Sequence, residues 1–261
     1  MTNTAIYTIV KRYFMFDLPE NIYKKEIADE AISNLKTVYP QNFCGDSMFV
    51  ANRNMNFYHD DEFMRCMNSL VTGEPYFGMA WRMHTMIWSV TQALAYPGAI
   101  MEFGTFRGFK MKFVMEYFGN KLDDRDVYLF DTFNGIDPEQ IEGSPNQPDE
   151  HQKAQLYRYI VNRFKAHKNV RIVKGAAPGS LDQVSLGKIS FIHLDMNSWM
   201  AEIGTLERIW DNIVLGGVVL LDDFGFTAHK AQNEKELLWF KERGHTPLEL
   251  PTGQGMVIKN V

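Results

Sequence analysis

The sequence predicts an α/β protein whose core is a doubly wound, mostly parallel sheet. Three observations support this prediction. From residue 96 onward, short apolar runs of strand length alternate with helical segments. These runs are mostly apolar, as in strands that helices cover on both faces. The chain before residue 96 shows only helical periodicity, so we expect a helical N-terminal region over 1–95 and a sheet core over 96–261.

The expected elements follow from apolar spacing and from turn residues. In the N-terminal region we expect no strand, and helices over 20–38, 60–70 and 77–95. In the core we expect strands over 99–103, 127–130, 170–173, 189–194 and 218–221, and helices over 109–118, 148–167 and 200–213. The Pro- and Gly-containing turn at 251–255 predicts an antiparallel hairpin of the strands 246–250 and 256–259 at the sheet edge.

Composition and charge narrow the class of protein. With 261 residues, 45% of them apolar, the chain can bury one large core. The net charge is −5 without a block of like charge, which argues against nucleic acid or an anionic membrane as a partner. No apolar run approaches the roughly 20 residues that span a bilayer. Cys44 and Cys66 make neither a metal cluster nor a disulfide framework, so we expect a cytoplasmic protein with reduced thiols.

The run over 100–108 predicts a turn between a strand and a helix that binds a ligand. Two glycines, four residues apart, follow the acidic Glu102. A dinucleotide site would need glycine at the position of Phe106, because the pyrophosphate lies against bare backbone at the helix N-terminus. Phe106 and Arg107 leave little room for it, and Glu102 favours a cationic ligand. S-adenosylmethionine, with an ammonium, a sulfonium and no phosphate, fits this pattern; a turn without a ligand is the alternative.

Acidic residues end three of the predicted strands. Asp131 follows the second strand, 23 residues after Gly108, where a doubly wound fold places the carboxylate that binds ribose hydroxyls. Asp195 ends the fourth strand, and Asp222 with Asp223 ends the fifth. Three neighbouring carboxylates repel one another unless a cation neutralises them, and Mg²⁺ prefers such oxygen ligands. Solvated aspartates that cap the following helices are the alternative.

Several motifs together resemble the macrocin O-methyltransferase family. They are Glu-x-Gly-x-x-Arg-Gly at 102–108, Phe-Asp-Thr-Phe-Asn-Gly-Ile at 130–136, His-Leu-Asp at 193–195, the segment 216–225 and Leu-Pro-Thr-Gly-Gln-Gly at 250–255. The resemblance covers about residues 77–259 and keeps the order of the family's motifs. These are class I, metal-dependent methyltransferases that act on sugar hydroxyls of macrolide and aminocoumarin antibiotics and similar natural products. The resemblance implies a Rossmann-like methyltransferase sheet, O-methylation of a small-molecule acceptor, and a homodimer.

The resemblance also implies roles for individual residues. The cofactor turn would consist of Glu102, Gly104 and Gly108, with Thr105, Phe106 and Arg107 lining it. The ribose and adenine would meet Asp131 and Phe133, and Gly175 and Ala176 would border the adenine. The magnesium ligands would be Asp195, Asp222 and Asp223.

One position departs from the family pattern. The family has Asp-x-Asp after the fourth strand, and its second Asp is the proposed general base. This chain has Asn197 there, and an amide cannot accept a proton at neutral pH. Three outcomes are open. The substrate hydroxyl, as in a phenol, catechol or enol, is acidic enough for a metal bound by Asp195, Asp222 and Asp223 to suffice; another base such as His229 or His84 substitutes; or methyl transfer to a hydroxyl is not the activity.

The third outcome would leave a cofactor-binding protein of the same fold with altered or lost methyl transfer. A nicotinamide-dependent oxidoreductase is a further alternative, which Phe106 and Arg107 argue against. His193 lies within a predicted strand, where a hydrogen-bonded core histidine is expected. The helix with Trp81 and Arg82 is interpreted as core packing or, together with the predicted loop 134–149, as the roof of an apolar acceptor pocket.

Overall fold

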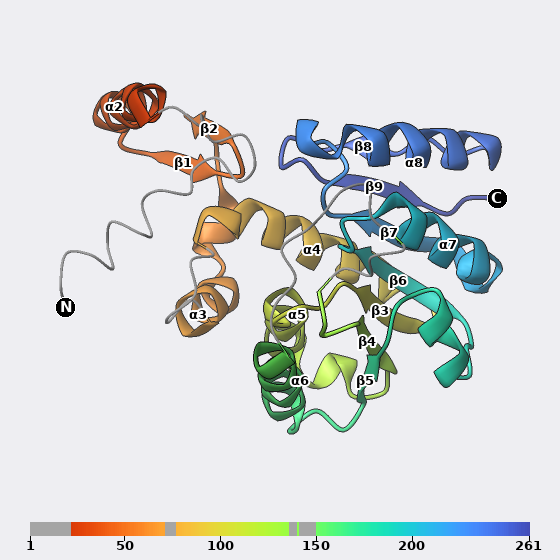
Figure 1. The fold of residues 1–261 in the computed structure, drawn as a ribbon. Coiled ribbons are helices and arrows are strands. Elements are labelled where there is room, and N and C mark those ends of the chain that lie inside the picture. Colours follow the sequence, from red (N-terminus) through yellow and green to blue (C-terminus); the bar gives the residue numbers. More distant parts are fainter. Residues whose placement is uncertain (1–21, 71–76, 136–139, 141–149) are drawn as a thin grey trace. The chain divides into compact units, whose positions relative to one another are not determined.

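The computed structural model describes residues 22–70, 77–135, 140 and 150–261 (Figure 1). The chain divides into two compact units. One, the N-terminal unit, consists of Met1–Thr85 with Phe226–Ala228, and the other, the sheet unit, of Met86–Gly225 with His229–Val261. The boundary between the two units falls within helix α4 (Ala80–Ala93). The predicted loop 134–149 lies mostly outside the described residues.

The sheet unit contains seven strands in the order β5-β4-β3-β6-β7-β9-β8. These strands are β3 (Ala99–Phe103), β4 (Val127–Asp131), β5 (Val170–Lys174), β6 (Ile189–Leu194), β7 (Ile213–Leu221), β8 (Leu248–Glu249) and β9 (Gly255–Ile258). The first five strands in this order are parallel, whereas β9 is antiparallel to both β7 and β8. The predicted fold class, with its C-terminal antiparallel hairpin, is therefore confirmed.

The burial of the central strands explains why this sheet forms. Every residue of β3 and β6 is buried, which fits strands with helices on both faces. The helices of this unit are α5 (Phe109–Phe118), α6 (Glu150–Phe164), α7 (Trp199–Ile209) and α8 (Lys230–Glu242). In Figure 1, α5 and α6 lie side by side, and α7 contacts α8.

The strand order determines where a ligand can bind. From β3 the chain proceeds through α5 to β4 and through α6 to β5, and then returns to place β6 on the other side of β3. The direction of winding therefore reverses between β3 and β6. Ligands of doubly wound sheets bind at such a point, outside the carboxyl ends of the strands.

Two element boundaries near β7 differ from the prediction. The helix expected over 200–213 ends at Ile209, and β7 begins at Ile213 rather than at residue 218. The strand includes Gly216, whose φ of +83° favours glycine. A Cβ at this position would lie 2.1 Å from the Tyr96 ring. The absence of a side chain at Gly216 thus leaves room for the Tyr96 ring beside the strand.

The N-terminal unit is not purely helical, so the prediction of a region without strands is wrong. Between α2 (Ile22–Val38) and α3 (Asp61–Leu70) lie two antiparallel strands, β1 (Asn42–Gly45) and β2 (Met48–Ala51). The turn residues Asp46 and Ser47 have φ of 48° and 57°, as in hairpin turns that match the twist of the strands. Since neither is glycine or asparagine, the usual sequence signal for this turn is missing.

Trp81 and His84 take part in an aromatic cluster of the N-terminal unit. The Phe57 ring centroid lies 5.3 Å from that of Trp81 and 4.9 Å from that of His84, and the imidazole is stacked on the phenyl ring. Burial lowers the pKa of His84, although the charge of Asp60 acts against this shift. These contacts support the interpretation of this helix face as core packing.

Arg82 is a buried charge within the same unit. Its Nε lies 3.3 Å from Oδ1 of Asp46, and both side chains are almost fully buried. The guanidinium also lies 5.3 Å from the centroid of the Phe226 ring. A buried ion pair of this kind is costly to break, because the remaining charge cannot be solvated.

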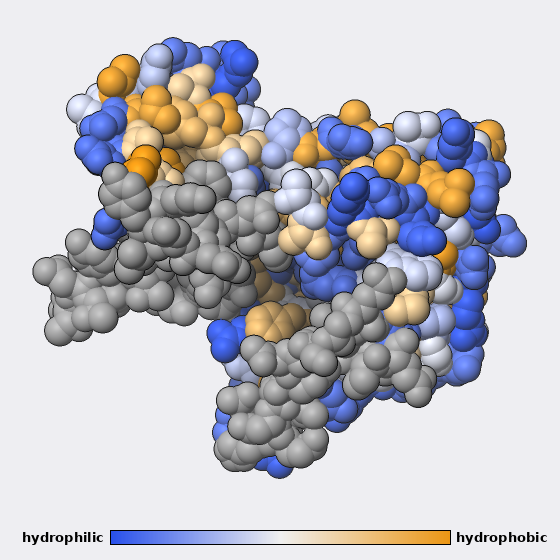
Figure 2. All heavy atoms as spheres, turned by 45° about the horizontal axis from the view of Figure 1, so that its top comes forward, coloured by the Kyte–Doolittle hydropathy of each residue, from blue (hydrophilic) through white to orange (hydrophobic). Residues whose placement is uncertain are grey.

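Apolar residues are also exposed on the N-terminal unit. Ile27, Leu35 and Val38 of α2 are 51%, 39% and 67% exposed, and Figure 2 shows hydrophobic side chains gathered on this unit. In the described part of the chain, no helix has both the length and the apolar character that a membrane crossing requires.

Candidate functional site

The glycine turn follows β3 at the point where the winding reverses. Gly104 has φ +87°, and a Cβ there would lie 1.9 Å from the backbone oxygen of Asp195. Gly108 has φ +64°, and a Cβ there would lie 2.7 Å from the Phe164 ring. Each glycine therefore also makes room for protein atoms, those of the loop after β6 at Gly104 and those of α6 at Gly108.

The residues between the two glycines differ in exposure. Thr105 is buried, and its hydroxyl donates to the backbone oxygen of Phe130 at 3.4 Å. Phe106 is 55% exposed with φ +46°, and the guanidinium of the exposed Arg107 lies 5.6 Å from its ring centroid. The turn therefore presents an aromatic and a cationic side chain to solvent.

Asp131 connects this turn to the turn after β4. Its Oδ2 accepts a hydrogen bond from the Phe106 N–H at 2.7 Å, and its Oδ1 accepts one from the Phe133 N–H at 2.5 Å. Burial raises the pKa of Asp131, although these two hydrogen bonds act against the shift. Each carboxylate oxygen can accept a second hydrogen bond, so Asp131 can still bind ribose hydroxyls.

The remaining predicted cofactor residues lie after β4 and β5. Phe133 is fully buried, with its ring centroid 5.3 Å from that of Tyr157. Gly175 donates from its N–H to the backbone oxygen of Asp131 at 3.0 Å, and the half-buried Ala176 follows it. The carboxyl ends of β3, β4 and β5 therefore bring the predicted cofactor residues to one edge of the sheet.

The acidic centre, which we define as Asp195, Asp222 and Asp223, lies after β6 and β7. One carboxylate oxygen from each residue lies within 4.8 Å of the others. Burial raises the pKa of Asp195 to about 7, and the charges of Asp222 and Asp223 contribute to this rise. Lys110 and His193 act against it. The sequence prediction that these three side chains converge is confirmed.

Lys110 is a member of this site that the sequence analysis missed. It is the second residue of α5, and its Nζ lies 2.6 Å from Oδ2 of Asp195. The same ammonium forms an ion pair with Oδ2 of Asp222. Lysine is unfavourable in the first turn of a helix, where the helix dipole is positive. A lysine at this position could therefore have indicated a nearby negative charge.

His193 connects the acidic centre to Glu102. The register of β3 and β6 places these two residues side by side, and His193 Nδ1 lies 3.2 Å from Glu102 Oε1. Its Nε2 lies 3.3 Å from Asp222 Oδ1. Burial alone would lower the pKa of His193, but the bonds to Asp222 and Glu102 raise it to about 9. The ring is therefore a cation that donates to two carboxylates.

The C-terminal hairpin also reaches the acidic centre. Gln254, in the turn before β9, donates from Nε2 to Oδ1 of Asp222 at 3.2 Å. Its own Oε1 accepts a hydrogen bond from the Thr252 hydroxyl at 3.0 Å. Both oxygens of Asp222 thus have donors or cations from the protein: His193 and Gln254 at Oδ1, and Lys110 at Oδ2.

A second pair of carboxyl groups lies beneath the loop after β6. Glu202 of α7 and Glu236 of α8 are fully buried, and the Met196 N–H donates to Glu202 Oε1 at 3.0 Å. Burial raises the pKa of Glu236 to about 7, and burial together with the charge of Glu236 raises that of Glu202 well above its usual range. The pair therefore retains a proton near neutral pH. No pattern in the sequence indicated it.

This geometry agrees with the comparisons to known proteins. Residues 78–243 match the model of the macrocin-O-methyltransferase (TylF) family. The chain belongs to this family. The resemblance seen in the sequence is thus confirmed, and the family is one of S-adenosylmethionine-dependent O-methyltransferases. No curated protein sequence matches the chain significantly.

Solved structures of methyltransferases share the fold. The O-methyltransferase NovP is 16% identical, with 71% of this chain and 82% of NovP covered at a TM-score of 0.57. CalS11, a TDP-rhamnose 3'-O-methyltransferase of calicheamicin biosynthesis, is 16% identical, with 94% and 96% covered at 0.56. PaMTH1 of Podospora anserina, whose structure contains S-adenosylhomocysteine, is 15% identical, with 94% and 98% covered at 0.54. At these identities the likeness concerns the fold.

The divalent metal that the sequence resemblance implies has suitable ligand types in the acidic centre, but not a suitable arrangement of them. Three carboxylates within 4.8 Å of one another are a suitable set of ligands for Mg²⁺. However, Lys110 already forms ion pairs with Asp195 and Asp222, and Asp222 also accepts from His193 and Gln254. A metal would have to displace these partners, so the residues as arranged do not fit a bound divalent ion.

The predicted base candidates are positioned differently from one another. Asn197 is exposed with φ +55°, a left-handed conformation that asparagine tolerates. His229 is half-buried, and burial lowers its pKa, whereas the nearby charge of Asp195 raises it. His229 and Asp195 thus interact electrostatically within the sheet unit. His84 belongs to the N-terminal unit and stacks on Phe57.

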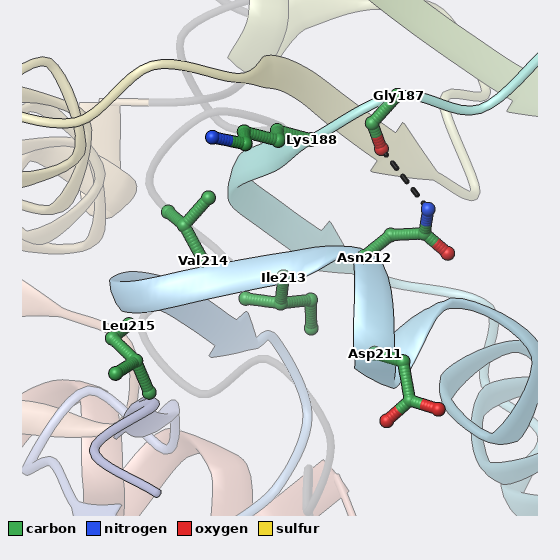
Figure 3. A pocket seen from close by; sticks show the side chains of 7 residues that line it. All are labelled: Gly187, Lys188, Asp211, Asn212, Ile213, Val214 and Leu215. Atoms are coloured by element: carbon green, nitrogen blue, oxygen red, sulfur yellow. Dashed lines mark hydrogen bonds between the residues drawn. The ribbon is translucent and has the colours of Figure 1, made fainter.

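A hollow at the opposite end of the strands is unrelated to these residues. Figure 3 shows it lined by Gly187 and Lys188, which precede β6, and by residues 211–215, which include the first three residues of β7. The carboxyl ends of the same strands carry Asp195 and Asp222. Since ligands of this fold bind at the carboxyl ends, we do not assign the hollow to the cofactor.

Proposed function

We propose that this chain transfers the methyl group of S-adenosylmethionine to a hydroxyl group of a small natural product or sugar. One observation carries the proposal: the glycine turn, Asp131 and the acidic centre converge at the carboxyl ends of the strands where the winding reverses. Asp131 supports cofactor binding because it fixes the backbone of two adjacent turns and keeps acceptor capacity. Family membership supports the reaction class.

The chain would contribute positioning and a base. When bound, the cofactor would supply a sulfonium methyl group for transfer to the acceptor oxygen, with S-adenosylhomocysteine as the leaving group. The acceptor hydroxyl must lose its proton, and we assign this step to His229, whose lowered pKa leaves a neutral imidazole at pH 7. Asp195 and Asn197 would orient the hydroxyl group. Much of the rate can come from this alignment alone.

Magnesium assistance is part of the function that the sequence predicts. The three carboxylates support it, and their ion pairs with Lys110 argue against it. The homodimer and the cytoplasmic location also remain predictions, which analytical ultracentrifugation and cell fractionation would test.

Ligand-dependent stability tests the cofactor site first. S-adenosylhomocysteine at 100 times its dissociation constant should stabilise the protein by about 2.7 kcal/mol, which raises the melting temperature by several degrees. NAD(H) should have no effect. If neither form of the sulfur cofactor shifts the melting temperature at millimolar concentration, the proposal is wrong.

His229→Ala tests the assigned base. Since general base catalysis contributes about 10²- to 10⁴-fold, kcat should fall by that factor while the affinity for S-adenosylhomocysteine stays the same. Turnover can be followed as S-adenosylhomocysteine release with a panel of sugar and phenolic acceptors. Full activity of the variant would exclude His229 as the base.

A cofactor-binding protein without methyl transfer is the second candidate, and Asn197 is the observation that favours it. Such a protein would bind S-adenosylhomocysteine but release none of it with any acceptor of the panel. Asn197→Asp restores the carboxylate of the family pattern. A gain of activity from this substitution alone would support the second candidate for the natural chain.

A further inference from the structure

The acidic centre contains a cation that belongs to the chain itself. Lys110 Nζ lies 2.6 Å from Asp195 Oδ2 and also forms an ion pair with Asp222 Oδ2. The side chain of Lys110 is only 12% exposed and that of Asp222 only 2%. An ion pair of this kind, shielded from water, is far less screened than a surface pair.

The position of Lys110 in α5 indicates that the carboxylates hold it there. A cation in the first turn of a helix faces the positive end of the helix dipole. Lys112, the fourth residue of the same helix, instead forms an ordinary i,i+4 pair with Glu116 at 2.6 Å. The unfavourable position of Lys110 is thus offset by its contacts to two aspartates.

A divalent ion would need the same oxygens. Mg²⁺ binds carboxylate oxygens at about 2.0–2.1 Å, so an ion held by Asp195 and Asp222 would lie within a few ångströms of the ammonium, and the two cations would repel each other. Rotation of Asp222 does not remove this conflict, because its other oxygen accepts from His193 and Gln254.

We propose that Lys110 replaces the divalent metal as the counter-ion of the acidic centre, and that this protein holds Asp195 and Asp222 in place without a metal ion. Lys110 acts as a positioning residue: it neutralises two carboxylates and fixes their orientation. The part of the proposal that concerns turnover rests on the proposed function. The part that concerns metal binding does not.

Direct binding of Mn²⁺, measured by electron paramagnetic resonance and calorimetry, tests the proposal without any acceptor. The wild-type protein should show no saturable Mn²⁺ site that depends on Asp222 up to about 1 mM. Lys110→Met removes the charge at similar volume and should create one Mn²⁺ site, with an affinity at least tenfold higher than any in wild type. Adding Asp222→Asn to Lys110→Met should abolish that site, and Lys112→Met should behave like wild type.

A wild-type protein that binds one Mn²⁺ at micromolar concentration, and loses it in Asp222→Asn, would overturn the proposal. Mn²⁺ that binds equally well to wild type, Asp222→Asn and Asp195→Asn lies outside the acidic centre and leaves that centre without metal, as proposed. If Lys110→Met does not fold, the Mn²⁺ titrations of wild type and of Lys110→Arg test the proposal instead. Lys110→Arg keeps the positive charge, so this variant should also bind no Mn²⁺ at the acidic centre. S-adenosylhomocysteine binding in the same samples reports separately on the proposed function.

Discussion

Glu236 shows how a single buried carboxyl group couples the stability of this protein to pH. Burial raises its pKa from 4.5 to about 7, so the folded chain keeps a proton that the unfolded chain releases. Its contribution to stability is fully present below pH 4.5 and is lost as the pH rises to about 7. The same sign applies to Glu202, whose pKa is also raised.

Glu236→Gln should remove this dependence, because the amide fills the same space and carries no charge at any pH. At pH 8 we expect the variant to have a free energy of unfolding higher than wild type by about 1–3 kcal/mol, since one pKa unit corresponds to about 1.4 kcal/mol. At pH 4.5 the two should be nearly equal. Urea denaturation at both pH values measures the difference, and Glu234→Gln on the exposed face of α8 is the control. If the free energy of unfolding changed equally between pH 4.5 and pH 8 in wild type and in Glu236→Gln, this account would be wrong.

At the scale of elements, the turn after β3 depends on the loop after β6. Gly104→Ala would place a methyl group 1.9 Å from the Asp195 backbone oxygen at a φ of +87°. We expect a loss of about 2–5 kcal/mol in the free energy of unfolding, because backbone atoms cannot move aside as a side chain does.

Gly179→Ala is the matched control for Gly104→Ala. A Cβ at Gly179 meets no atom within 4 Å, so the change should stay within about 0.5 kcal/mol. Denaturation of both variants in urea gives the comparison. Equal stability of the two variants would show that the turn relaxes around the new methyl group.

The sheet elements were predictable because their sequence signals are local. Mostly apolar runs predicted β3 and β6 with correct boundaries. The parallel arrangement of the strands then predicted that the acidic residues at their ends lie close together. The β1–β2 hairpin was missed because its turn has positive φ at Asp46 and Ser47 without glycine or asparagine there.

The partners of the site residues were not predictable, because they depend on contacts between distant segments. Lys110 is separated by 85 residues from Asp195 and by 112 from Asp222. A single sequence gives the position of a lysine on a helix, but not the direction in which its long side chain reaches. His193 was expected to be a hydrogen-bonded core residue; the acidic partners Glu102 and Asp222 were not expected.

For the whole molecule, the division into two units predicts that some changes affect stability and leave cofactor binding intact. Asp46→Asn removes the charge that pairs with the buried Arg82 in the N-terminal unit. Breaking such a pair costs about 3–5 kcal/mol, so the melting temperature should fall clearly. The candidate cofactor residues all belong to the sheet unit.

We therefore expect the dissociation constant of S-adenosylhomocysteine to stay within about twofold in Asp46→Asn, measured by calorimetry well below the melting temperature. Asp29→Asn, a substitution on the half-exposed surface of α2, serves as the control for stability. A parallel loss of cofactor affinity and stability in Asp46→Asn would show that the two units are energetically inseparable.

The ammonium of Lys110 is covalently attached to the polypeptide, so every molecule carries one copy of it at any dilution. A dissociable ion leaves its ligands when its free concentration falls below the dissociation constant, and a chelator can remove it. The ion pairs of Lys110 with Asp195 and Asp222 are independent of the supply of ions in the medium. Starvation for divalent metals would leave this charge balance unchanged.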